Sequence, residues 1–260
     1  MHFNLLDNLL WALSFAGNVV LLVVLLMKER WKQFPVFTFL IADFVAETIA
    51  LFLIYSYGSF RWYTIIYWAT FLLDFLLQIA LLFEIARIVL RPTGTWLRDA
   101  RSSFLLWAAS GAIAALALSY AVRPPAQSWL AALEVRAILF TSLLFCELFF
   151  AMMLSAQRLG LVWRSHVMRL GQGLTAWSLA TMLVNTAHSY LGTTNKQLFN
   201  TLEHVRILVY IFVTAYWAVT FWSPEPERRP LSPQMLQYLV ALHEKVQYDA
   251  SQVRGAQNPH

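Results

Sequence analysis

The chain has 260 residues, of which 59% are hydrophobic and only 13% are charged. Soluble domains carry about a quarter of their residues charged, so this composition excludes an ordinary water-soluble globular protein. The net charge of +5 does not indicate nucleic-acid binding, because most basic residues lie in short segments between apolar runs. The single cysteine, Cys146, excludes an intramolecular disulfide.

Seven apolar segments follow one another along the chain, and each can cross a bilayer core, which takes about 20 helical residues. We therefore expect an all-α fold: a polytopic membrane protein with a bundle of seven transmembrane helices over residues 1–222. The predicted spans are 5–27, 34–57, 63–90, 103–122, 128–156, 170–191 and 199–222. The first segment lacks a charged n-region and a cleavage site, which predicts a retained helix rather than a signal peptide.

Lysine and arginine are unevenly distributed between the predicted spans. The first, third and fifth connections and the C-terminal tail, together with Arg87 near the end of the third span, hold 14 of the 19, whereas the other connections hold three. The positive-inside rule then predicts that the N-terminus is outside and the C-terminus cytoplasmic. Residues 223–260 form the predicted tail, in which Ser232 and Pro233 indicate the start of an amphipathic helix over about 233–249.

Acidic residues occur within the predicted spans, far from most basic residues. Asp43 and Glu47 are one helical turn apart, so they share a helix face. Ionisable groups are costly in lipid, so this face is expected to point into the bundle. There the acids can tie helices together as neutral hydrogen-bond donors, relay protons, or bind a small cation such as Na⁺. The candidate acidic cluster comprises Asp43, Glu47, Asp74, Gln78, Glu84 and Glu147.

A second polar layer lies nearer the predicted outer ends of the last three spans. It comprises Glu134, Arg136, Asn185, His188, Glu203, His204 and Arg206. Acids and bases are mixed in this layer, which favours mutual ion pairs close to the interface. The alternative is a pocket open to the outside that binds a small polar ligand.

Motifs of common enzymes are absent from the sequence. There is no HExxH, GxSxG, P-loop or GxGxxG pattern, and His188 and His204 lack the spacing of a zinc site. We therefore expect no catalytic residues, no metal and no cofactor. The remaining enzymatic alternative is an intramembrane hydrolase built from the scattered acids and His188.

Three stretches resemble an uncharacterised family of bacterial seven-helix integral membrane proteins. They are "KQFPVFTFLIADF", "YWATFLLDFLLQIALLFEIARIVLRP" and "YWAVTFW" in the last span. This resemblance extends over most of the chain. It implies the seven-helix architecture and a multi-pass location in the inner (cytoplasmic) membrane, and it implies no particular activity.

A local resemblance joins "GNVVLLVVLL", "FLIADF" and "FEIARIVLRP" to the first three helices of rhodopsin-like receptors. It implies that Asn18 and Asp43 belong to a sodium site, so Asn18 joins the candidate acidic cluster. It also implies a cytoplasmic lock between an acid and an arginine. Here Arg87 follows Glu84 by three residues instead of being adjacent, and the helix-seven NPxxY motif is missing.

Three classes of function fit these patterns. The first is a non-enzymatic, receptor-like module that senses a small polar ligand or binds a partner. The second is a proton- or cation-coupled transporter, which the unpaired carboxylates would serve. The third is an accessory or scaffold subunit that associates with other membrane proteins or with further copies of itself. In each case the lipid bilayer surrounds the helices and nucleic acid is not a partner.

Overall fold

The computed structural model describes residues 5–57, 59–90, 97–121, 128–155, 165–191 and 196–225. These residues form seven α-helices and one short 3₁₀ helix, and no strand occurs among them. The elements are α1 (Leu5–Met27), η1 (Arg30–Lys32), α2 (Pro35–Tyr57), α3 (Phe60–Leu90), α4 (Leu97–Ala121), α5 (Trp129–Ser155), α6 (His166–Leu191) and α7 (Lys196–Trp222). The predicted all-α fold class with seven helices is confirmed. The predicted tail helix lies outside the described residues.

Local sequence explains where several helices begin. Pro35 is the first residue of α2, a position where its fixed φ angle and missing N–H cost nothing. Ser128 caps α5, because its hydroxyl oxygen accepts a hydrogen bond from the Ala131 amide at 3.2 Å. Glu29 adopts a left-handed φ of 54° between α1 and η1, which turns the chain sharply back toward α2.

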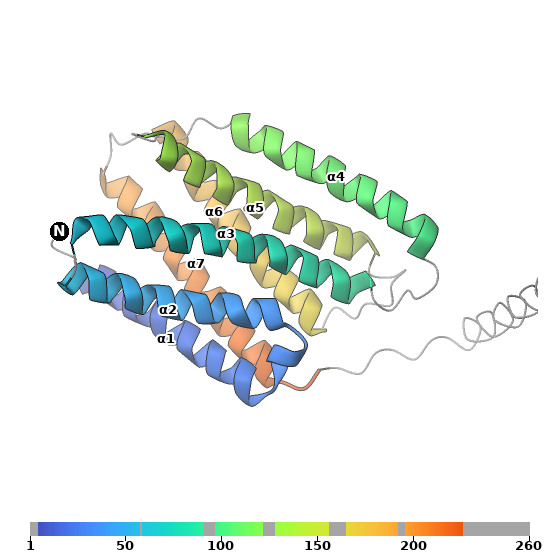
Figure 1. The fold of residues 1–260 in the computed structure, drawn as a ribbon, viewed down its shortest axis with the longest axis horizontal. Helices are drawn as coiled ribbons and strands as arrows, with labels where there is room; N and C mark the ends of the chain where they lie inside the picture. The colour runs from blue at the N-terminus through green and yellow to red at the C-terminus, as the bar shows by residue number, and fades with distance from the viewer. Residues whose placement is uncertain are drawn as a thin grey trace, which may run out of the picture. The chain divides into compact units, whose positions relative to one another are not determined.

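Most helices pack against their sequence neighbours, but α3 packs on α5 instead of α4, and α6 and α7 close the bundle. α1 contacts α2, α2 contacts α3, and α3 contacts α5, while α4 contacts α5. α7 packs between α1 and α6, and α6 also contacts α5 and α3. Figure 1 shows α4 at one edge of the bundle, beside α5, and α1 with α2 at the opposite edge. α3, α5 and α6 each contact three other helices.

The most closely packed part of the bundle lies at the end that holds the connection between α1 and α2, here called the α1–α2 end. Four aromatic rings meet there edge to face or tilted, with centroids 5.1–5.6 Å apart: Phe34, Phe37, Trp217 and Phe221. Gly173 allows this packing, because a Cβ at that position would collide with the Trp217 ring. The other end, where α1 begins, is called the N-terminal end, and fewer of its apolar side chains are fully buried.

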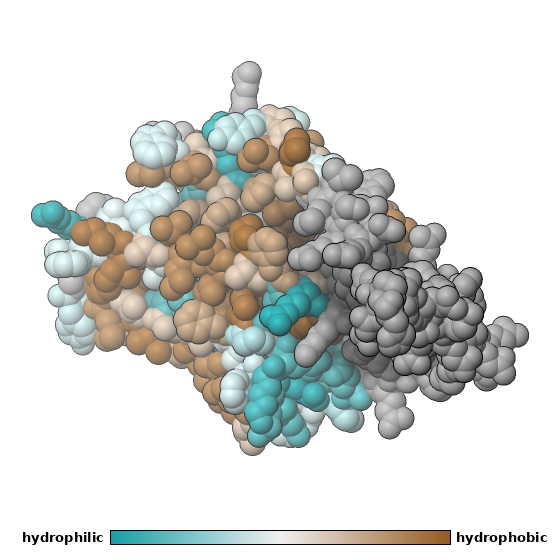
Figure 2. Space-filling view, turned by 45° about the vertical axis from the view of Figure 1, so that its right-hand side comes forward, coloured by the Kyte–Doolittle hydropathy of each residue, from teal (hydrophilic) through white to brown (hydrophobic). Residues whose placement is uncertain are grey.

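Large apolar side chains cover much of the described surface. Phe83 on α3 and Phe212 on α7 are each 72% exposed, and Leu183 on α6 is 71% exposed. Figure 2 shows hydrophobic residues spread over the middle of one face, with hydrophilic residues gathered toward its margins. Continuous apolar surface of this kind is rare on soluble monomers and is typical of helices that face lipid.

Five helical segments are long and apolar enough to cross a membrane. They are Leu5–Met27, Pro35–Ile54, Arg61–Val89, Trp129–Leu154 and Gln197–Trp222. In α4, the apolar stretch with described side chains, Ala109–Ala121, is shorter than a span. The structure thus supports a helical membrane protein, and over their described residues α4 and α6 are less apolar than these five segments.

Candidate functional site

Three of the predicted acids come together near the middle of the bundle. Asp43 and Glu47 of α2 face Asp74 of α3 closely enough for their charges to interact. Glu47 accepts a hydrogen bond from the Thr70 hydroxyl at 2.8 Å, and Asp74 Oδ2 accepts one from the Gln78 amide at 2.8 Å. Asp43 Oδ2 and Asp74 Oδ1 are buried and have no hydrogen-bond partner. We call Asp43, Glu47, Asp74 and Gln78 the central acid cluster.

Asn18 connects α1 to α7 through Tyr210, which is close enough to Asp74 and Glu47 of the central acid cluster to interact with their charges. The Tyr210 hydroxyl donates a hydrogen bond to Asn18 Oδ1 at 2.7 Å, and Asn18 is only 5% exposed. The Tyr210 ring lies between Phe44 of α2 and Trp177 of α6, with centroids 6.4 and 4.9 Å away. Tyr210 was not among the predicted site residues. Its position could have indicated it, because Tyr210 lies in the middle of a predicted span, whereas tyrosine usually occurs at the membrane interface.

Glu84 is separate from the central acid cluster and has a structural role. Its two carboxylate oxygens accept hydrogen bonds from the backbone amides of Val36 at 2.8 Å and Phe37 at 3.1 Å. These amides are in the first turn of α2 and have no acceptor within their own helix. A carboxylate from α3 therefore caps α2, where the positive end of the helix dipole also favours a negative charge. Arg87, the predicted lock partner, is exposed.

Glu147 also lies apart from the central acid cluster. Its carboxylate is next to Gly111 of α4, and a side chain at residue 111 would collide with it. The neighbouring Cys146 is a free, half-buried thiol. Glu147 thus belongs to the contact between α4 and α5.

The outer polar residues form separate small groups and do not surround one pocket. Glu203 contacts Arg206 at 2.5 Å within α7 and lies 3.5 Å from Nδ1 of His188 on α6. The His188 ring stacks on Phe199 with centroids 3.7 Å apart. The side-chain nitrogen of Asn185, one turn from His188, is buried and has no hydrogen-bond partner.

The remaining outer residues connect other helix pairs. His204 of α7 contacts Asp7 of α1 at 2.7 Å, and Asp7 was not predicted because it lies at the very start of an apolar span. Glu134 of α5 accepts a hydrogen bond from the Tyr67 hydroxyl of α3 at 2.6 Å. Arg136 of α5 lies 4.6 Å from the ring of Tyr120 on α4, a cation–π contact.

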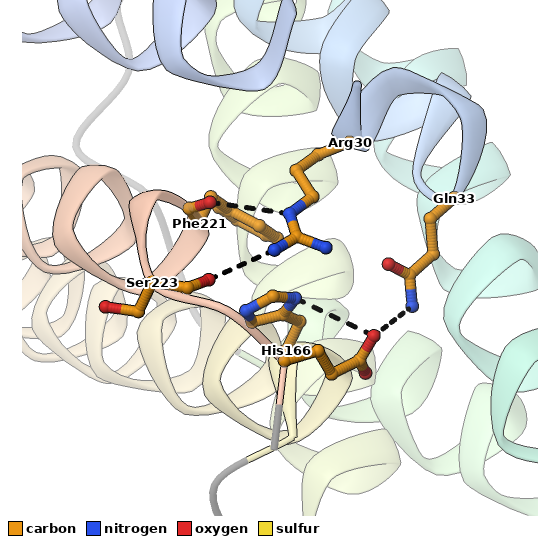
Figure 3. Close-up of polar contacts among 6 residues, drawn as sticks. Arg30, Gln33, His166, Phe221 and Ser223 are labelled. Atoms are coloured by element: carbon orange, nitrogen blue, oxygen red, sulfur yellow. Dashed lines mark hydrogen bonds and ion pairs between the residues drawn. The ribbon is translucent and has the colours of Figure 1, made fainter. Parts of the chain in front are cut away.

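A third polar group, not predicted from the sequence, fastens the α1–α2 end; we call it the end clasp (Figure 3). The Arg30 guanidinium donates to the carbonyl oxygens of Phe221 at 3.4 Å and Ser223 at 3.0 Å, where the negative end of the α7 dipole favours a cation. Glu225 accepts a hydrogen bond from the Gln33 amide at 3.1 Å. The end clasp therefore attaches the turn after α1 to the end of α7.

His166, the first residue of α6, completes the end clasp. Its side chain is 1% exposed, its ring lies 5.4 Å from that of Phe221, and its Nδ1 is 3.9 Å from Glu225 Oε2. Burial lowers the pKa of His166, and the nearby charge of Arg30 lowers it further. The negative charge of Glu225 raises the pKa of His166, and the more weakly acting Arg169 lowers it. The imidazole is therefore neutral at pH 7.

No group of three or more His, Cys, Asp or Glu side chains in the described ranges is placed to hold a metal ion. Comparison with known proteins gives no further guide, since no family model, curated protein or solved structure matches the chain. The resemblances to a bacterial seven-helix family and to rhodopsin-like receptors gain no support from these comparisons. The geometry of the polar groups is therefore the basis for any functional assignment.

Proposed function

We propose that the chain crosses the inner membrane seven times with its N-terminus outside, and that it is a non-enzymatic, receptor-like module for sensing a ligand or binding a partner. α4 and α6 have 25 and 26 residues. At about 1.5 Å per residue each is roughly 38 Å long, enough to cross a hydrocarbon core of about 30 Å.

The lower apolarity of α6 fits its position in the bundle. Because α3, α5 and α7 surround it, most of its surface contacts protein and can be polar. Its large exposed side chains, Leu179, Leu183 and Tyr190, recur at helical spacing and form one narrow stripe. Such a stripe is expected of a spanning helix that meets lipid on only one side.

The observation that carries the sensing proposal is the set of polar contacts that α7 makes at three depths. At the N-terminal end, His204 contacts Asp7 and Glu203 contacts His188. In the middle, Tyr210 bonds Asn18. At the α1–α2 end, the last carbonyls of α7 bond Arg30. A rigid helix held at these three depths can transmit a shift at one end to the other.

Hydrogen exchange measures this coupling directly. Glu203→Gln weakens the outer contacts of α7 with α6, so we expect faster amide exchange in residues 28–34 and 219–225, at the far end. Glu134→Gln is the matched control, because Glu134 lies in the same outer layer and bonds α3 instead of α7. If the two variants change exchange in the end clasp equally, or if neither changes it, α7 does not couple the two ends.

A specific observation also favours the second candidate, a proton- or cation-coupled transporter. Asp43 Oδ2 and Asp74 Oδ1 are buried carboxylate oxygens with no hydrogen-bond partner, as a proton or small cation would require. A transporter predicts proton or sodium flux in vesicles containing the purified protein, and loss of that flux with Asp74→Asn. Vesicles that show no such flux above protein-free vesicles would exclude this candidate.

A further inference from the structure

A groove of about 550 Å³ lies between α4, α5 and α6. Its walls include Leu139 and Leu143 of α5 and Met182 of α6. Leu118 of α4 and Tyr190 of α6, which also line it, are 54% and 88% exposed. The groove therefore opens sideways between α4 and α6, onto the surface that faces lipid in a seven-span arrangement.

The lining of the groove is mainly apolar, and the hydroxyls of its two serines are hydrogen-bonded within their own helices. The Ser119 hydroxyl donates to the carbonyl oxygen of Leu116 at 2.8 Å, and the Ser189 hydroxyl donates to that of Asn185 at 2.9 Å. Both of these protons are used within their own helices, which leaves the hydroxyls of Thr186 and Tyr190 as the other polar side-chain groups of an otherwise apolar lining. A hydrocarbon chain suits this lining better than a polar molecule does.

One cation, Arg136, lies one helical turn from the lining of the groove. Arg136 is one turn from Leu139 on the same face of α5, toward the N-terminal end. Its guanidinium lies over the ring of Tyr120, which is adjacent in sequence to the lining residues Ser119 and Ala121 of α4. Arg136 Nε is buried and has no hydrogen-bond partner, and among the described residues no ion pair joins Arg136 to a carboxylate.

Nearby acids do not neutralise this arginine. Glu134 lies on another face of α5 and bonds Tyr67 of α3. An arginine in this position can present its planar N–H groups to a phosphate, the anion whose geometry it matches best. The apolar groove and the positive charge one helical turn from it together match the polarity of a lipid with a negative headgroup.

We propose that the groove between α4, α5 and α6 binds an anionic phospholipid, with an acyl chain against Leu139 and Met182 and the phosphate on Arg136. The proposal depends on residence of the chain in a membrane and not on a sensing or transport role. It adds a lipid-selective site on the side of the bundle formed by α4, α5 and α6.

Native mass spectrometry of the full chain in mild detergent tests this site, with phosphatidylglycerol and phosphatidylcholine as probes. Both lipids carry a phosphate, but the choline ammonium offsets the negative charge of phosphatidylcholine, so we expect the wild type to bind phosphatidylglycerol roughly tenfold more tightly. Arg136→Gln should abolish the difference, and Arg136→Lys should keep part of it. Arg61→Gln removes an exposed arginine of α3 and should leave it unchanged.

Two further measurements distinguish a bound phospholipid from a bound soluble anion. Thr186→Trp fills the groove and should weaken binding of both lipids, whereas glycerol phosphate without acyl chains should not compete. Equal affinity of the wild type for the two lipids would overturn the proposal. It would also be overturned if Arg61→Gln and Arg136→Gln reduced the preference for phosphatidylglycerol equally. Competition by glycerol phosphate would also overturn it, because the site would then bind a soluble anion.

Discussion

The cap that Glu84 provides for α2 gives the sharpest stability prediction. Glu84→Ala removes both acceptors from the amides of Val36 and Phe37, which are 2.8 and 3.1 Å from the carboxylate oxygens. A buried donor left unsatisfied costs about 1–3 kcal/mol, and loss of a helix cap costs about 0.5–2 kcal/mol. Since these effects overlap, we expect the variant to lose about 2–4 kcal/mol of unfolding free energy.

Thermal unfolding in detergent measures this loss. For a chain of about 150–250 residues, 1 kcal/mol shifts the unfolding midpoint by about 2–4 °C, so Glu84→Ala should lower it by roughly 5–15 °C. Glu84→Gln keeps one acceptor oxygen and should lose about half as much. Hydrogen exchange gives the local measurement, because the amides of Val36 and Phe37 lack acceptors in their own helix and depend on Glu84 for protection.

Arg87→Gln is the matched control for Glu84→Ala. It removes a charge from the same end of α3. Arg87 is exposed, however, and Glu84, not Arg87, accepts the hydrogen bonds from the first amides of α2. We expect at most a small change of the unfolding midpoint and no change in exchange at Val36 or Phe37. If Glu84→Ala and Arg87→Gln behave alike in both measurements, the carboxylate does not stabilise α2 and the reasoning is wrong.

Three further predictions concern contacts in other parts of the bundle. Tyr210→Phe leaves a buried amide oxygen on α1 unpaired, so it should cost about 1–3 kcal/mol of unfolding free energy, whereas Tyr216→Phe, at an exposed site, should cost less than about 1 kcal/mol. Because burial lowers the pKa of His166 below its ordinary 6.5, the unfolded chain binds this proton more readily. The wild-type unfolding midpoint should therefore fall as pH decreases below 6.5, and His166→Gln should reduce that fall when both are measured across the same pH series. Gly173→Ala forces a methyl group into the indole ring of Trp217 and should cost about 1–3 kcal/mol of unfolding free energy. Gly17→Ala should be tolerated in the same unfolding assay, because the nearest atom would be 3.4 Å from the new methyl group.

The helices could be predicted closely from apolar runs and their breaks. α1 has the predicted bounds, and α2, α3 and α5 differ from prediction by at most three residues at either end. α6 begins at His166, four residues before the predicted 170, because His166 and Arg169 interrupt the apolar pattern although His166 is buried against Phe221 of α7. α4 begins at Leu97 instead of 103, since backbone hydrogen bonding continues through charged residues that carry no apolar signal.

The central acid cluster was predictable in part, and the other polar contacts were not. One-turn spacing places Asp43 and Glu47 on one face, and the antiparallel order of α2 and α3 brings Asp74 opposite them. The role of Glu84 could not be predicted, because its partners are backbone amides, which every residue except proline carries. The contact of Asp7 with His204 joins residues 197 positions apart, and no local pattern specifies such a pair.

The number of membrane crossings is the claim on which the proposed function depends, and one labelling position decides it. Ser128 is exposed between α4 and α5. With Cys146 replaced by serine, Ser128→Cys in intact cells should react with a membrane-impermeant maleimide, because seven crossings with the N-terminus outside place residue 128 outside. If only the five most apolar helices cross, with the same N-terminus, residue 128 lies in the cytoplasm. Labelling only after the cells are permeabilised would therefore contradict the account.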